Sequence, residues 1–171
     1  MRVLPLCLIA LSLAACNSAR NPPLGAGFDA AEAAFIKTSG AGTIEGQAFL
    51  RDRTGESNVR YAAGEVVRLV PATSYAQARF SHYYGGAKFV PAASIPKVEA
   101  DPEYAAYTRT TKADTKGRFS FDHVAPGRYF VTAQLIWKPK DSFLSQGGAM
   151  YDEATITGKE TGPVEVILSG N

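Results

Sequence analysis

The residues that most often build catalytic and metal sites are scarce in this chain. It holds two histidines, His82 and His123, and two cysteines, Cys7 and Cys16, both near the N-terminus. A zinc site of His and Cys is therefore excluded from the folded part, and two histidines with carboxylates are the remaining metal alternative. His123 falls at the end of a predicted strand, where an exposed polar residue is the simpler interpretation. No serine stands in a G-x-S-x-G motif, so we expect no enzyme, no metal and no cofactor.

Aromatic residues gather in the segment 72–107, the strongest candidate for binding. Long stretches without regular structure are uncommon inside small domains and often carry function. Aromatic side chains offer a large contact area at low entropic cost. We predict a surface that binds a protein or glycan partner through six side chains: Tyr75, Phe80, Tyr83, Tyr84, Tyr104 and Tyr107. The alternative is that these rings fold back and cap an open end of the domain. Residues 73–84 fit an extra strand or a short helix.

Alternating apolar side chains predict two strands near the centre of the chain. Phe119 and Phe121 are two residues apart, so they point to one face of a strand. The same alternation runs over residues 129–137, where Trp137 is in phase with the apolar side and is expected in the core rather than as a sugar platform. We assign Asp114 to a polar hairpin turn rather than to a calcium-binding loop, because the ligand spacing of a calcium loop is missing. At the following corner we expect Gly127 to take the left-handed conformation.

Further strands frame this centre and define one domain. We expect them over residues 43–50, 65–70, 150–157 and 163–168, where apolar residues alternate or run between turn residues. The domain then covers residues 43–171, with 72–107 as a long Tyr-rich loop insertion. Residues 16–42 form a tether, within which residues 28–37 fit either a short helix or an extended lead-in.

The central stretch matches the sequence pattern of a known domain. The pattern is an acidic turn ending in Gly, then G-x-F-x-F, then V-x-P-G-x-Y. Seven residues of this chain match it in order: Gly117, Phe119, Phe121, Val124, Pro126, Gly127 and Tyr129. This pattern resembles the carboxypeptidase regulatory-like domain, a prealbumin-like β-sandwich. Asp114 fits the acidic turn, although Thr115-Lys116 replaces the commoner acidic residue before Gly. The resemblance implies an all-β, Greek-key antiparallel sandwich of about seven strands. It also implies a role as stalk, spacer, docking module or carbohydrate-associated module.

The first residues are typical of an export signal. Arg2 precedes an apolar stretch that is too short to span a bilayer, so residues 1–15 are predicted to be a signal peptide. The sequence Leu13-Ala14-Ala15-Cys16 resembles a bacterial lipobox. That resemblance implies cleavage before Cys16 and attachment of acyl chains such as palmitate, which anchor a protein at about 0.8 kcal/mol per buried methylene. An ordinary secretory signal is the alternative. Asn17 after the cysteine favours the outer membrane, facing the periplasm.

These features together predict a lipid-anchored β-sandwich of the cell envelope that binds or docks without catalysis. The formal net charge of +2 gives no argument for nucleic acid. A component of a secretion or transport assembly is one alternative, since the outer-membrane lipoprotein of type VI secretion is similar in architecture. A carbohydrate-binding module is the other.

Overall fold

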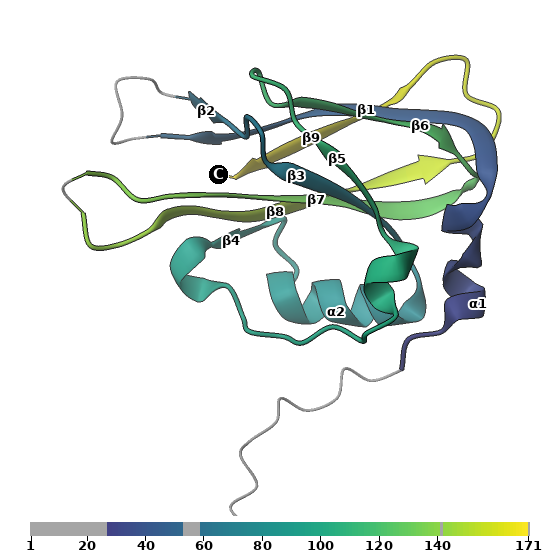
Figure 1. The fold of residues 1–171 in the computed structure, drawn as a ribbon, viewed down its shortest axis with the longest axis horizontal. Coiled ribbons are helices and arrows are strands. Elements are labelled where there is room, and N and C mark those ends of the chain that lie inside the picture. The colour runs from purple at the N-terminus through teal and green to yellow at the C-terminus, as the bar shows by residue number, and fades with distance from the viewer. Residues whose placement is uncertain (1–26, 53–58, 141, 171) are drawn as a thin grey trace, which may run out of the picture.

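Two packed β-sheets form the body of the protein (Figure 1). The structure is a computed structural model and describes residues 27–52, 59–140 and 142–170. The first sheet contains four strands: β1 (Ser39–Arg51), β2 (Val59–Tyr61), β6 (Arg118–Val124) and β9 (Val164–Gly170). The second sheet has the order β4 (Phe89–Pro91), β8 (Gln146–Ile156), β7 (Gly127–Trp137), β3 (Val66–Pro71) and β5 (Arg109–Lys112).

This arrangement confirms the predicted all-β sandwich and corrects its details. The described residues form nine strands, two of which are the three-residue strands β2 and β4, which have no clear alternation in the sequence. Strand β6 and then β2 pair antiparallel along one edge of β1, whereas β9 runs parallel to the other edge. The first sheet is therefore mixed, and the second is antiparallel throughout.

The core lies between the two sheets, as the alternation predicts. Phe119, Phe121 and Tyr129 are at most 5% exposed and pack in one cluster with Ile44 and Leu168. Trp137 is half-buried against the same cluster. The guanidinium of Arg60 lies 4.7 Å from the centre of its ring, so this indole is not an open sugar platform.

The turn before β6 has the predicted form. The Asp114 carboxylate accepts hydrogen bonds from the backbone N–H groups of Lys116 and Arg118, both at 2.8 Å, which hold its pKa below the usual value. Gly117 adopts a φ of 73°, and a Cβ there would lie 2.3 Å from the carbonyl oxygen of Ala48. Glycine is thus required by both conformation and space.

The corner before β7 differs from the prediction. Gly127 has a φ of 159°, which is positive but far from the left-handed helical region, whereas His123 takes the left-handed conformation at 56°. A Cβ on Gly127 would lie 2.5 Å from the ring of Phe35. The positive φ and the close packing of this aromatic ring therefore both explain the glycine.

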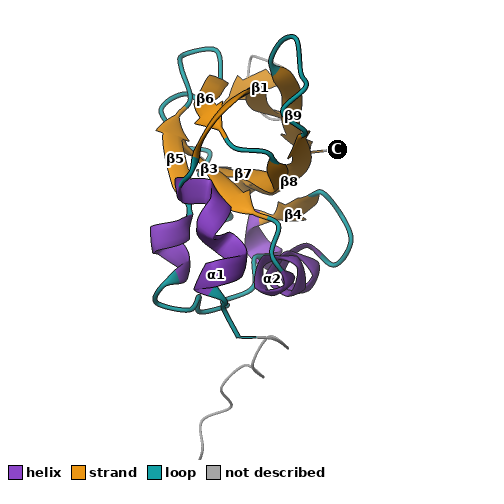
Figure 2. Ribbon diagram, turned by 90° about the vertical axis from the view of Figure 1, so that its right-hand side faces the viewer, coloured by secondary structure: helices purple, strands orange, loops and turns teal. Residues whose placement is uncertain are grey.

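The segment 72–107 is a layer of short elements rather than a long loop. Its main element is helix α2 (Ser74–Tyr84), followed by strand β4 and the helical turns η2 (Ala92–Ser94) and η3 (Tyr104–Tyr107). Upstream, residues 28–37 contain the short helix α1 (Ala30–Ala33) and the turn η1 (Ala34–Lys37). Figure 2 shows α1 and α2 together on the same side of the sandwich, beneath the second sheet.

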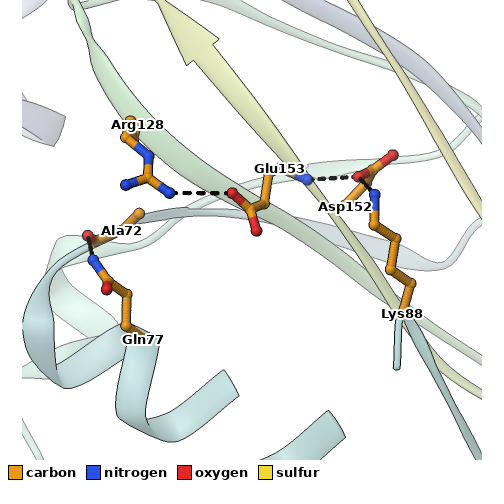
Figure 3. A network of polar contacts seen from close by, with 6 residues as sticks. All are labelled: Ala72, Gln77, Lys88, Arg128, Asp152 and Glu153. Atoms are coloured by element: carbon orange, nitrogen blue, oxygen red, sulfur yellow. Dashed lines mark hydrogen bonds and ion pairs between the residues drawn. The ribbon is translucent and has the colours of Figure 1, made fainter. Parts of the chain in front are cut away.

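Polar contacts lie at the start of α2, between the layer and the second sheet, and within that sheet (Figure 3). The Gln77 side chain donates to the Ala72 carbonyl at 2.8 Å, closing the first turn of the helix. Beyond the helix, Lys88 forms an ion pair with Asp152 of β8. Asp152 also accepts a hydrogen bond from the backbone N–H of Glu153, whose carboxylate pairs with Arg128 at 3.3 Å.

In the part of the chain that the structure describes, every helix is too short to cross a membrane. Cys16 and the predicted signal peptide lie outside the described residues.

Candidate binding site

The outer face of the second sheet supplies the floor of the candidate site. Along β7, the residues that alternate with the core point outward; Thr132 and Gln134 are among them. On β3, Arg68 and Val70 occupy the corresponding outward positions, because Val67 and Leu69 are in the core. Apolar and polar side chains therefore share this face, whereas the inner face is mainly apolar.

Helix α2 covers part of this floor through aromatic stacking. Phe80 stacks on Phe130 with ring centroids 4.2 Å apart, and Tyr84 lies 4.4 Å from Tyr151 of β8. These rings belong to a second buried cluster with Val70, separate from the core between the sheets. Burial of this aromatic layer is what fixes α2 over the sheet.

A pocket of about 340 Å³ remains where the layer is incomplete, and we call it the outer-face pocket. Its floor consists of residues from β3, β5 and β7, one wall is the second half of α2, and the other wall is the segment 100–108. Four of its lining residues come from the helix: Arg79, Phe80, Tyr83 and Tyr84. This volume lies near the lower end of the range of about 300–1,000 Å³ that is usual for small-ligand sites.

Hydrogen bonds fix the polar groups of the pocket. The Thr132 hydroxyl donates to the Met150 carbonyl at 2.9 Å, so at its 2.9 Å contact with Tyr84 the tyrosine O–H must be the donor. Gln134 donates to the Tyr83 hydroxyl oxygen at 3.0 Å. The Tyr83 O–H hydrogen can therefore be donated to a bound molecule.

The tyrosine hydroxyls of the pocket are neutral at ordinary pH. Burial raises the pKa of Tyr84 well above its usual value and raises the pKa of Tyr104 to about 12. The Tyr83 pKa is also raised by burial. These groups can therefore serve as O–H donors and weak acceptors, but not as bases near neutral pH.

Arg79 joins the two walls of the pocket. Its guanidinium donates to the carbonyl oxygens of Glu99 and Val98, at 3.0 and 3.1 Å, and lies 5.5 Å from the centre of the Tyr104 ring. The segment before η3 is thus held against α2 by an oriented cation, and Tyr104 is kept at the pocket.

The fold is similar to that of a protein of known structure. A crystal structure of a proposed carbohydrate-binding protein from Pseudomonas aeruginosa superimposes with a TM-score of 0.67. The two sequences are 31% identical, and the match covers 84% of this chain and 97% of that one. The chain belongs to the same family as this protein. No family profile and no curated protein matches the sequence, so the resemblance to the carboxypeptidase regulatory-like domain stays a prediction.

In this member of the family, the six predicted aromatic residues divide into two groups. Four of them line the outer-face pocket: Phe80, Tyr83, Tyr84 and Tyr104. Tyr75 and Tyr107 instead pack around Phe28 beside α1, at centroid distances of 5.7 and 5.3 Å. Tyr75, Phe80 and Tyr84 are buried and the other three half-buried.

The rings are therefore neither a fully exposed contact surface nor a cap on an open end of the sandwich. They cover the outer face of one sheet and leave a pocket in it. The sequence interpretation missed Arg68, Arg79, Thr132 and Gln134 as site residues. Thr132 and Gln134 had a usable signal, since both lie on the polar side of the alternating strand at 127–137. No pattern in the sequence indicated Arg68 or Arg79 as site residues.

The lining of the outer-face pocket consists of aromatic, cationic, amide, hydroxyl and aliphatic side chains. Among the described residues that line it there is no Asp, Glu, His or Cys. Most glycoside hydrolases need a pair of carboxyl groups on either side of the bond they cleave. Across the described ranges, the structure also contains no cluster of three or more His, Cys, Asp or Glu residues that could hold a metal ion.

Proposed function

We propose that the protein is a non-catalytic carbohydrate-binding protein, held at the bacterial cell envelope by lipid on Cys16. The observation that carries this proposal is the outer-face pocket, where aromatic rings meet oriented hydrogen-bonding groups. The assignment of the Pseudomonas aeruginosa family member as a proposed carbohydrate-binding protein supports the same ligand class.

Sugars present two kinds of surface, and the pocket offers a partner for each. The C–H face of a sugar ring is apolar and packs against aromatic rings, which Tyr83 and Tyr104 provide at half-buried positions. Sugar hydroxyls need both donors and acceptors, which the Tyr83 hydroxyl and the Gln134 side chain provide. A few placed polar groups in an otherwise apolar cleft are typical of specific small-ligand sites.

The lipid anchor rests on the sequence. Leu13-Ala14-Ala15-Cys16 fits the lipobox, and the tether would place the sandwich close to the membrane. Replacing Cys16 with Ser in cells should move the protein from the membrane fraction to the soluble fraction and abolish palmitate labelling. Retention of the variant in the membrane would argue against lipid on Cys16.

Calorimetry of the purified chain with short envelope oligosaccharides tests the binding function. Tyr83→Ala should weaken binding roughly thirtyfold, because truncating a central aromatic contact costs about 2 kcal/mol. Tyr61→Ala is the matched control, since Tyr61 is exposed on β2 of the other sheet. Heat of binding that is equal in both variants would place the sugar elsewhere, and no heat with any saccharide would end the proposal.

A further inference from the structure

We infer that the saccharide held in the outer-face pocket carries a negatively charged group, a uronate carboxylate or a sugar phosphate, bound by Arg68 and Arg79. This inference rests on the proposed carbohydrate-binding function and adds the charge class of the ligand. It is motivated by the cationic lining of a pocket that has no carboxylate in its described lining.

Arg68 lies at the centre of the pocket floor. It belongs to β3, and its register partners are Thr110 on β5 and Thr132 on β7, both of which also line the pocket. The side chain is on the outward face and exposed. In the described part of the chain Arg68 has no ion-pair partner, so its charge is available to a ligand.

Arg79 approaches the same space from the α2 wall. Its two hydrogen bonds to the carbonyl oxygens of Val98 and Glu99 fix the plane of the guanidinium without neutralising its charge. A guanidinium has further N–H groups to donate, in a fork that matches the oxygens of carboxylate and phosphate. Preorganisation of this kind reduces the entropy lost when a ligand binds.

The two arginines act on the same part of the pocket. The positive charges of both lower the pKa values of the Tyr83 and Tyr104 hydroxyls against the larger, opposing effect of burial. The nearby acidic residues, Glu99, Asp101 and Glu103, are on the adjacent segment and do not line the pocket. A neutral ligand would displace water from the two guanidinium groups without compensating their charge. An anionic ligand would form ion pairs with them.

Two matched pairs of sugars test the inference by calorimetry on the purified chain. The first pair is trigalacturonate and its methyl ester, which share rings and hydroxyls and differ in charge. The second is glucose 6-phosphate and glucose. We expect the acidic member of one pair to bind roughly tenfold or more tightly than its neutral partner, since hydrogen bonds to charged groups are the stronger ones. The pair that shows the difference distinguishes a uronate from a sugar phosphate.

Arg68→Gln is the decisive variant because this side chain is exposed and its loss should not disturb the fold. It should bring acidic and neutral sugars to nearly equal affinity, and Arg79→Gln should do the same if α2 stays in place. Arg128→Gln is the matched control, since Arg128 lies on the same sheet outside the pocket lining and is paired with Glu153. Equal affinity within both pairs in the wild-type protein would overturn the inference while leaving the proposed function intact. Binding of none of the four sugars would count against both.

Discussion

At the scale of single residues, the buried hydroxyl of Tyr129 is an internal polar contact of the sandwich. The O–H donates to the Ala125 carbonyl at 2.8 Å, four residues upstream across the corner before β7. Tyr129→Phe should lower the free energy of unfolding by about 1–2 kcal/mol, because it leaves a buried carbonyl unpaired. Urea unfolding measures this. Tyr61→Phe, at an exposed position, should be neutral; an equal loss in both variants would contradict the explanation.

Glu160 should give the fold part of its dependence on acidic pH. Its carboxylate accepts hydrogen bonds from the Thr157 hydroxyl and backbone N–H, both at 2.6 Å, and from the Gly158 N–H at 2.9 Å. These bonds lower its pKa from 4.5 to about 2. The lowered pKa means that the stabilisation is complete above pH 4.5 and is lost as the pH falls through about 2.

Glu160→Gln should therefore destabilise the protein at pH 6 but not at the acid end of this window. The measurement is urea unfolding of both proteins at several pH values. A difference in stability that stays constant from pH 6 to pH 2 would show that the carboxylate charge is not the cause.

At the scale of elements, α2 forms one wall of the outer-face pocket over the second sheet. Both ends of this helix are well defined. The buried Thr73 hydroxyl accepts the Ala76 N–H at 3.2 Å, and Gly85 ends the helix in the left-handed conformation. Thr73→Ala should cost about 1 kcal/mol in free energy of unfolding, as loss of an N-cap usually does. Thr73→Ser keeps the oxygen and should cost less; thermal or urea unfolding of both variants decides. Identical losses would show that the methyl group, not the cap, matters at this position.

The strands were predictable from the sequence because burial of one face leaves a period of two. Phe119, Phe121 and the run beginning at Tyr129 carry that period, and all three are buried as predicted. The segment 72–107 was not predictable to the same degree. Its helix is aromatic and weakly amphipathic, because it packs on the outer face of a sheet that is itself partly polar. Rings that stack although they are far apart in the sequence, such as Phe80 and Phe130, produce no recognisable pattern in the local sequence.

The pocket was predictable only in part. The density of tyrosines indicated the segment that supplies both walls of the outer-face pocket, and four of the six predicted aromatic residues line this pocket. The sequence did not predict the two arginines as pocket residues, since Arg68 by itself is one polar residue on the outer side of a strand. Its significance depends on the register that places Thr110 and Thr132 beside it and on the helix that folds over them.

At the scale of the whole molecule, the core between the sheets is separate from the layer that contains the proposed binding pocket. The core between the sheets contains the predicted apolar residues, while α2 lies against the outer face of the second sheet (Figure 2). A separate hollow of about 570 Å³, lined by Glu45, Arg118 and other residues near the first sheet, is one competing location for a ligand.

Mapping of backbone amide shifts shows whether a saccharide binds in the outer-face pocket, as we propose. The purified, isotope-labelled chain is titrated with whichever of the four test sugars binds most tightly, and amide shifts are followed by heteronuclear NMR. We predict that the largest changes fall in residues 79–84, 100–108 and 132–134 and are lost in Tyr83→Ala. Changes concentrated around Glu45 and Arg118, or none at saturating sugar, would contradict the account.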